Sequence, residues 1–501
     1  MNGIRRALLW ASADRYLGLI VNFVLLATIS RILTPAEIGV SVIGVGLITI
    51  AQTVREFATP EFLIPRAEVT RVDAQTAFTI MVSLSAIVSA VLLVLAPWLA
   101  AFYAEPGLAP FIQLIAAANF LSALPVPITT LMKRDMAFAH ISVINVATTL
   151  TNAGVTILLG LHGFSYLAIG WALVAAAAVT CILAFALRPD LWILRPAVAS
   201  WRKVLHFGGY NGGLSLLRNA FDSLPQLALA RILPLPAIGL YNRALTLSSI
   251  PDKFVLAGIL AVAFPAFAAG VREGRPLPRL YLQTLSYITA VYWPTMILVA
   301  LLARPIVTIT LGPQWMEAVP LVQILALANL FWFPSSLTYP VLASVGAIRD
   351  GLVVHLITLP ASAVVLIAAC LVGGLEGMAF SQFVTIPFQM YVTFLFIRRH
   401  APFSWSELVQ ALRPSAIVAL CSAAAAGFGV AATSAHDGPS LLTAAVTLPL
   451  AAAGWGVGLR ITRHPVFGEL ARTAAALGRR IRGIGSVRRR SMPSSSPEKS
   501  W

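Results

Sequence analysis

Seven ionisable residues lie inside or at the ends of long apolar stretches: Asp14, Arg15, Arg55, Arg218, Asp222, Asp252 and Lys253. An ionisable group within a membrane span is costly, so each is a candidate functional residue. An arginine offers a planar fork of donors and a lysine a compact charge, and both suit a diphosphate group. We therefore expect Arg15, Arg55, Arg218 and Lys253 to line a cationic, substrate-binding cavity.

The three acids Asp14, Asp222 and Asp252 have a different expected role. They could balance the charge of the cations or carry a coupling ion, H⁺ or Na⁺, and no cofactor is expected. Structural alternatives exist for each cluster. Arg15 and Arg55 could extend to lipid headgroups at span ends. Arg218 and Asp222, spaced i, i+4, could form an ion pair on one helix face. Asp252 and Lys253 could belong to an interfacial loop.

The composition shows what kind of element must position these groups. Of the 501 residues, 58% are hydrophobic and 11% are charged. A soluble domain carries roughly 25% charged residues because its surface faces water. Continuous apolar runs of 18 or more residues are typical of membrane-spanning helices rather than barrel strands. The sequence thus predicts an all-α polytopic membrane protein.

The apolar runs predict about 14 transmembrane helices, with polar segments between them. They cover 10–31, 38–56, 75–101, 108–131, 140–160, 164–187, 207–230, 244–269, 281–302, 318–341, 350–372, 376–397, 411–433 and 440–460. The first six form an expected N-terminal lobe, 1–190, and the next six a C-terminal lobe, 205–400. Two further helices follow at 411–460. The basic segment 461–501 ends in a Ser/Pro-rich stretch and predicts a disordered cytoplasmic tail near membrane lipid.

Lysine and arginine are distributed unevenly between the two sides of these spans. With the N-terminus in the cytoplasm, 28 of the 35 basic residues fall on the cytoplasmic side and four on the opposite side. Cytoplasmic loops carry such an excess in membrane proteins. The expected protein therefore lies in the cell (inner) membrane with both termini cytoplasmic. Its formal net charge of +16 is explained without nucleic acid as a partner.

One stretch occurs twice in the chain. RILTPAEIGV (31–40) returns as RILPLPAIGL (231–240), with Arg31, Ile38 and Gly39 matching Arg231, Ile238 and Gly239. Likewise, IQLIAAAN (112–119) returns as VQILALAN (322–329). Long-period self-similarity in a membrane protein is typical of transporters. Because six spans separate the copies, the two six-helix bundles are expected to be parallel, with the repeated arginines capping helix ends at the far side.

Motifs of enzymes and metal sites are missing from the sequence. It has no HExxH, GxSxG or Walker pattern, and its seven histidines lack metal-ligand spacing. Cys181, Cys370 and Cys421 lie in apolar runs without CxxC spacing, as small apolar residues would. We expect a protein that is not an enzyme and holds no metal.

The chain resembles bacterial polysaccharide flippases of the multidrug/oligosaccharidyl-lipid/polysaccharide exporter superfamily. The resemblance rests on the ordered set of the two repeated stretches, FPAF (264–267) and LGPQW (311–315), together with fourteen spans. It implies a two-lobed carrier that moves undecaprenyl-diphosphate-linked oligosaccharide to the outer leaflet by alternating access. Related lipid flippases place cavity cations on helices 1, 2 and 8, where this chain has Arg15, Arg55 and Lys253.

The expected function is translocation of lipid-linked oligosaccharide for exopolysaccharide, capsule or O-antigen (lipopolysaccharide) biosynthesis. Its expected partners are that substrate, membrane lipids, and the polysaccharide polymerase and chain-length machinery. Two alternatives stay open. One is a cation-coupled small-molecule exporter of the same superfamily, against which the cationic cavity argues. The other is a membrane glycosyltransferase or polymerase, which would be expected to place acids and a sizeable loop on the far side.

Overall fold

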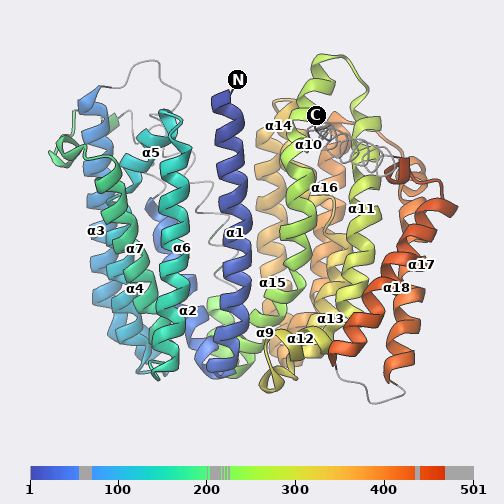
Figure 1. Ribbon diagram of the computed structural model, residues 1–501, viewed down its shortest axis with the longest axis horizontal. Helices are drawn as coiled ribbons and strands as arrows, with labels where there is room; N and C mark the ends of the chain where they lie inside the picture. Colours follow the sequence, from blue (N-terminus) through green and yellow to red (C-terminus); the bar gives the residue numbers. More distant parts are fainter. Residues whose placement is uncertain are drawn as a thin grey trace, which may run out of the picture. The chain divides into compact units, whose positions relative to one another are not determined.

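The computed structural model describes residues 2–55, 70–199, 201–202, 216, 219, 223, 226–434 and 440–468, and every regular element among them is a helix (Figure 1). These residues belong to two compact units. Unit 1 comprises 1–249, 303–329 and 348–393, and unit 2 comprises 250–302, 330–347 and 394–501. The boundaries of the two predicted lobes stay a prediction.

Unit 1 is built from long helices and a few short ones. They are α1 (Asn2–Ile32), α2 (Pro35–Arg55), α3 (Arg71–Phe102), α4 (Leu108–Ala123), α5 (Val126–Arg134), α6 (Phe138–Leu161), α7 (Leu167–Leu187), η3 (Leu191–Leu194), α9 (Leu235–Ser248), α12 (Ala303–Thr310), η5 (Pro313–Trp315), α13 (Ala318–Ala328), α15 (Ile348–Phe380) and the first part of α16 (Gln382–His400). Its helix packing includes α1 on α6, α6 on α7, α3 on α4 and α2 on α9.

Unit 2 is organised around α11 (Leu277–Leu301). Its other elements are η4 (Asp252–Leu256), α10 (Ala257–Arg272), η7 (Ser335–Leu337), α14 (Thr338–Ser344), the end of α16, α17 (Trp405–Ser434) and α18 (Ser440–Ile461). The 3-10 turn η6 (Asn329–Phe331) lies where units 1 and 2 adjoin in sequence. The last two helices pack along each other, and α17 also packs along α11. A buried cluster of Ala290, Val418 and Leu459 joins the three.

A proline inside α11 explains one polar contact of this packing. Pro294 has no N–H, so it frees the carbonyl of Ala290, four residues earlier. The indole Nε1 of Trp455 on α18 donates to that carbonyl at 2.8 Å. In lipid a freed carbonyl needs such a partner, because no water is present to replace the lost bond. The predicted C-terminal helix pair is therefore tied to the centre of α11.

Ten helices among the described residues are long and apolar enough to cross a membrane, or eleven if the bent pair Ala318–Phe331 and Ser335–Ser344 counts as one span. This confirms a polytopic all-helical membrane protein. The number fourteen stays a prediction. Most of the expected span 207–230 lies outside the described residues.

Several expected spans differ in detail from the structure. The stretch 108–131 is divided into α4 and α5, and 318–341 is broken between α13 and α14. Two further differences concern the backbone. The stretch 244–269 was expected as one helix, but the π-helical turn η4 interrupts it after Pro251 and separates α9 from α10. The expected break between 372 and 376 is a turn at Gly374, with φ +57° and ψ −139°, inside α15. Residues with a Cβ rarely adopt this conformation, so glycine is required there.

Candidate functional site

Arg55, a predicted substrate-binding residue, ends α2 and contacts α4. Its Nη1 donates to Ser122 Oγ at 2.6 Å and to the carbonyl of Asn119 at 3.3 Å. The side chain is half-buried. The helix dipole favours a cation at a helix C-terminus. The two acceptors fix the direction in which the guanidinium points. Arg55 is thus an oriented cation in unit 1, and Ser122, which the sequence analysis did not identify, helps to orient it.

Asn119 belongs to the same chain of polar contacts. Its Nδ2 donates to Ser89 Oγ on α3 at 3.0 Å, and that hydroxyl donates to the carbonyl of Ala116 at 2.9 Å. Asn119 is fully buried. In this structure Asn119 makes an inter-helix contact, between α3 and α4.

Asp14 and Arg15 lie side by side on α1. Asp14 Oδ2 accepts a hydrogen bond from Asn145 Nδ2 of α6 at 2.7 Å. Arg15 is exposed. The Asp14 carboxylate is therefore held against α6.

Asp252 and Lys253 begin the π-helical turn η4 in unit 2. Asp252 Oδ1 accepts a hydrogen bond from the hydroxyl of Tyr292 on α11 at 2.7 Å, and Tyr292 is fully buried. Lys253 is exposed. Single π-turns inside helices are frequent at functional sites. Asp252 could be predicted from the sequence but Tyr292 could not, since nothing in a single sequence links two residues 40 positions apart.

The other two predicted residues, Arg218 and Asp222, lie outside the described residues. The remaining candidates divide between the units. Asp14, Arg15 and Arg55 belong to unit 1, and Asp252 and Lys253 belong to unit 2. In the part of the chain that is described, no three His, Cys, Asp or Glu side chains form a group that could hold a metal ion.

The two copies of the repeated stretch contact each other within unit 1, where α2 packs on α9. A Cβ built on Gly39 would overlap the carbonyl oxygen of Leu235, and a Cβ built on Gly239 would overlap the carbonyl oxygen of Pro35. Each glycine therefore permits the backbone of the other copy to approach. Glycine at such a crossing is typical of closely packed membrane helices.

Polar side chains also join the first copy of the stretch to the second half of the chain, at the C-terminal end of α1. Ser30 carbonyl oxygen accepts hydrogen bonds from Gln314 Nε2 at 2.5 Å and from Trp315 Nε1 at 2.6 Å. Both donors come from the LGPQW motif, whose Gly312 adopts φ +104°. Arg31 Nη2 donates to the carbonyl of Ile309 at 2.6 Å, at the C-terminus of α12. Figure 1 shows the end of α1 beside α12.

The second copy and the residues just before it also contact the first half of the chain. Arg231 lies over the ring of Phe102, 5.7 Å from its centroid. The hydroxyl of Tyr103 donates to the carbonyl of Leu227 at 3.1 Å. Arg31 and Arg231 were expected to cap helix ends. Arg31 does lie in the last turn of α1. In addition, each arginine reaches an element of the other half, so the repeated stretch is a joint between the copies.

A family profile described as "Polysaccharide biosynthesis protein" matches residues 28–320, more than half of the chain. Among curated proteins, the chain is 24% identical over 331 residues to the lipopolysaccharide biosynthesis protein WzxC of Escherichia coli (strain K12), covering 64% of this chain. It is also 24% identical over 331 residues to the succinoglycan biosynthesis transport protein ExoT of Rhizobium meliloti (strain 1021), covering 65% of this chain. Each match spans 66% of the relative's own length.

Two solved structures share the fold. The lipid II flippase MurJ in an inward closed conformation aligns with a TM-score of 0.69 at 10% identity, covering 91% of this chain and 98% of MurJ. An inward-facing multidrug resistance transporter of the MATE family aligns with a TM-score of 0.61 at 12% identity, covering 81% of this chain and 99% of that protein. These alignments confirm the all-α polytopic membrane fold that the sequence predicted.

Proposed function

We propose a function from one premise, that the chain belongs to the polysaccharide biosynthesis protein family, whose profile matches residues 28–320. The chain is a flippase that carries undecaprenyl-diphosphate-linked oligosaccharide across the inner membrane for cell-surface polysaccharide. Its termini lie in the cytoplasm. The similarity to WzxC and ExoT, a lipopolysaccharide biosynthesis protein and a succinoglycan biosynthesis transport protein, supports this substrate class. As a carrier, the chain would not be an enzyme.

Arg15 and Arg55 are proposed to hold the diphosphate in unit 1. Arg15 is exposed, and Arg55 is directed by Ser122 and Asn119 at the end of α2. Together they offer guanidinium forks that match phosphate oxygens. Lys253 and Arg218 are proposed as further cations. Asp14 and Asp222 would balance their charge.

Asp252 is proposed as the site of the coupling ion, H⁺ or Na⁺. One oxygen of its carboxylate accepts a hydrogen bond from the buried hydroxyl of Tyr292. Asp252 also begins a π-helical turn, where the backbone departs from α-helical geometry. In this proposal Asp252→Asn removes the dependence of transport on the ion gradient. Unchanged ion dependence in that variant would exclude Asp252 from coupling.

The joint between α2 and α9 is proposed to be the closed end of an alternating-access cycle. The contacts that support this are the packing of Gly39 and Gly239 and the hydrogen bonds to Ser30. The joint lies at the end of α1 opposite the N-terminus, which charge distribution predicts to be the outer side. Opening toward the outer leaflet then requires α2 and α9 to separate.

The proposal is tested in a host in which the gene is deleted and no paralogue is present. The measured quantity is the fraction of lipid-linked repeat unit in the outer leaflet, from its reaction with a membrane-impermeant sugar-modifying enzyme. The full chain is expected to restore this fraction. Arg55→Gln is expected to lower the initial rate by at least about tenfold, since a hydrogen bond to a charged group contributes about 1.5–3 kcal/mol.

The matched control is Arg304→Gln, which removes an exposed arginine of α12 in the same unit. It is expected to transport at the rate of the unchanged chain. If the repeat unit reaches the outer leaflet normally after deletion, the proposed function fails. Ion-driven efflux of small cations by the purified protein would instead identify a drug exporter, and sugar transfer in vitro would identify a glycosyltransferase.

A further inference from the structure

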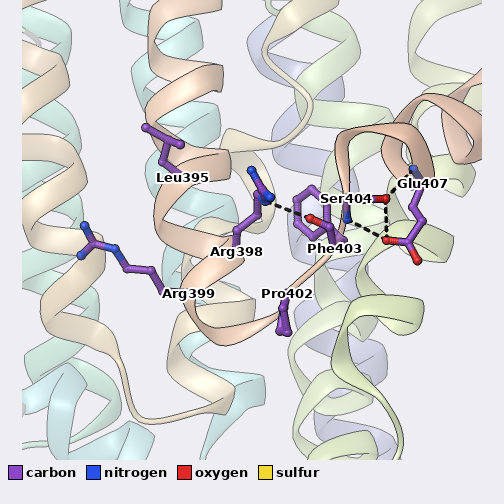
Figure 2. Close-up of a pocket in the computed structure, with 7 residues that line it drawn as sticks. All are labelled: Leu395, Arg398, Arg399, Pro402, Phe403, Ser404 and Glu407. Atoms are coloured by element: carbon purple, nitrogen blue, oxygen red, sulfur yellow. Dashed lines mark hydrogen bonds between the residues drawn. The ribbon is translucent and has the colours of Figure 1, made fainter.

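A pocket of about 540 Å³ lies in unit 2 where α16 ends and α17 begins, and no site residue discussed above belongs to it. Its lining residues are Leu395, Arg398, Arg399, Pro402, Phe403, Ser404 and Glu407. Figure 2 shows Arg398 between Arg399 on one side and Phe403, Ser404 and Glu407 on the other. The pocket therefore places two guanidinium groups beside a short loop that joins two helices.

Arg398 is held in one orientation by its neighbours. Its Nε donates to the carbonyl of Phe403 at 2.9 Å, and its guanidinium lies 4.9 Å from the ring centroid of Trp405. A guanidinium fixed in this way has less conformational freedom to lose on binding. The Nε bond leaves the two terminal nitrogens, which form the fork that matches a phosphate or carboxylate.

The balance of charge in the pocket favours an anion. Arg399 is exposed and its guanidinium stacks 4.2 Å from the ring centroid of Phe396. The single acid, Glu407, accepts from the backbone N–H of Ser404 at 2.7 Å and from its hydroxyl at 3.0 Å. That carboxylate completes a helix cap and is directed at the start of α17. Two cations thus remain for a ligand.

Exposed apolar side chains on the two helices that form the pocket indicate that the anion carries a hydrocarbon chain. Leu395 lies one turn before Arg399 on α16 and is 38% exposed, while Trp405 and Val409 of α17 are 41% and 65% exposed. Exposed apolar side chains of this kind are suited to contact acyl chains. Basic pockets between membrane helices at the cytoplasmic side are suited to anionic lipid headgroups.

We propose that this pocket binds the phosphodiester headgroup of an anionic phospholipid, with its acyl chains along Leu395, Trp405 and Val409. The distribution of lysine and arginine places the pocket at the cytoplasmic leaflet. The pocket contains none of the proposed substrate-binding cations. A test of lipid binding here therefore does not depend on the proposed transport function. It would fix a lipid at the junction between α16 and the last two helices.

The test uses the purified full chain in detergent and native mass spectrometry with two probes, dioleoyl phosphatidylglycerol and dioleoyl phosphatidylcholine. The unchanged chain is expected to bind the anionic lipid about tenfold more tightly than the zwitterionic one, as one lost charge-assisted contact predicts. The double variant R398Q/R399Q is expected to lose this preference. R272Q, which removes an exposed arginine at the end of α10, should retain it.

Two outcomes would overturn the proposal. The first is an unchanged preference in R398Q/R399Q. The second is full competition by inorganic phosphate at millimolar concentration, which would assign the site to a free anion rather than a lipid. If loss of the Phe403 contact unfolds the double variant, R399Q decides. It leaves the Arg398 contact intact and is expected to weaken binding of phosphatidylglycerol several-fold, and unchanged binding would overturn the proposal.

Discussion

Gly39 of α2 and Gly239 of α9 occupy equivalent positions of the repeated stretch and pack against each other's helix, so that a Cβ on Gly239 would lie 3.2 Å from the backbone nitrogen of Gly39. The same residue type thus serves the same purpose on both sides of one crossing. Sequence similarity between the stretches and their contact in space have a common physical basis. Two helix backbones can approach this closely only where the facing position on each helix is a residue without a side chain.

Alanine at either glycine should force the two helices apart. Overpacking a close contact typically costs 1–3 kcal/mol, so we expect Gly39→Ala and Gly239→Ala each to lower the thermal unfolding temperature of the purified protein. Gly154→Ala in α6 is the control, because a Cβ there would meet nothing within 4 Å. Equal unfolding temperatures for all three variants would show that the crossing is not close in solution.

Gly374 offers a test of backbone strain without any change in packing. It adopts φ +57° and ψ −139°, and a Cβ would meet nothing within 4 Å. Gly374→Ala should therefore destabilise the protein by about 1–3 kcal/mol through strain alone. The adjacent Gly373 lies in helical backbone with equally open space, so Gly373→Ala should be neutral or slightly stabilising in the same thermal unfolding assay.

The contribution of the Trp455–Ala290 hydrogen bond to the free energy of unfolding should depend on Pro294. Trp455→Phe leaves the freed carbonyl of Ala290 without its donor, and we expect a loss of about 1 kcal/mol in unfolding free energy. In a Pro294→Ala background the new backbone N–H can bond that carbonyl, so the same substitution should cost less. A double-mutant cycle measures the difference. Additive effects would mean that the indole stabilises α18 only by packing.

The environment of His464 predicts that the free energy of unfolding falls in mild acid. The buried ring follows α18, and its Nε2 lies 2.9 Å from Ser286 Oγ and 3.3 Å from Ser415 Oγ. Burial lowers the pKa of His464 below its ordinary value of 6.5. Because the unfolded chain then binds the proton more readily, this contribution to stability is present above about pH 6.5 and is lost as the pH falls toward the lowered pKa.

The measurement is the thermal unfolding temperature of the unchanged protein and of His464→Gln between pH 7.5 and pH 5.5. The unchanged protein should lose more stability over this interval, since glutamine can hydrogen-bond but does not titrate here. An equal loss in both proteins would assign the acid sensitivity to other groups.

The features that could be predicted from sequence are those that depend on local composition or on self-similarity. Apolar runs predicted most spans, and Gly374 lies where a break was expected. Contacts between distant residues could not be predicted. Pro294 shows that the Ala290 carbonyl needs a donor, but no local signal identifies Trp455 as that donor. Tyr292 was missed for the same reason, because its partner Asp252 lies on another helix.

The candidate site was predicted as a set of residue types, and the structure adds direction to some of them. Arg55 was identified from its place at a span end, whereas its acceptors on α4 follow only from helix packing. The π-turn at Asp252 was read as the start of a continuous helix. Pro251 and the charged pair that follows it are the local signal that could have indicated a break there.

The exchange of contacts between the two repeated stretches has the form of an isologous interface, as in a homodimer with two-fold symmetry. In such a dimer one gene position would supply both glycines of the crossing. In a single chain two positions supply them, and each must remain glycine independently. Compared with a homodimer, the single chain therefore has twice as many positions at which one substitution disrupts this crossing. It also means that neither half can bury its own copy of the stretch without the other.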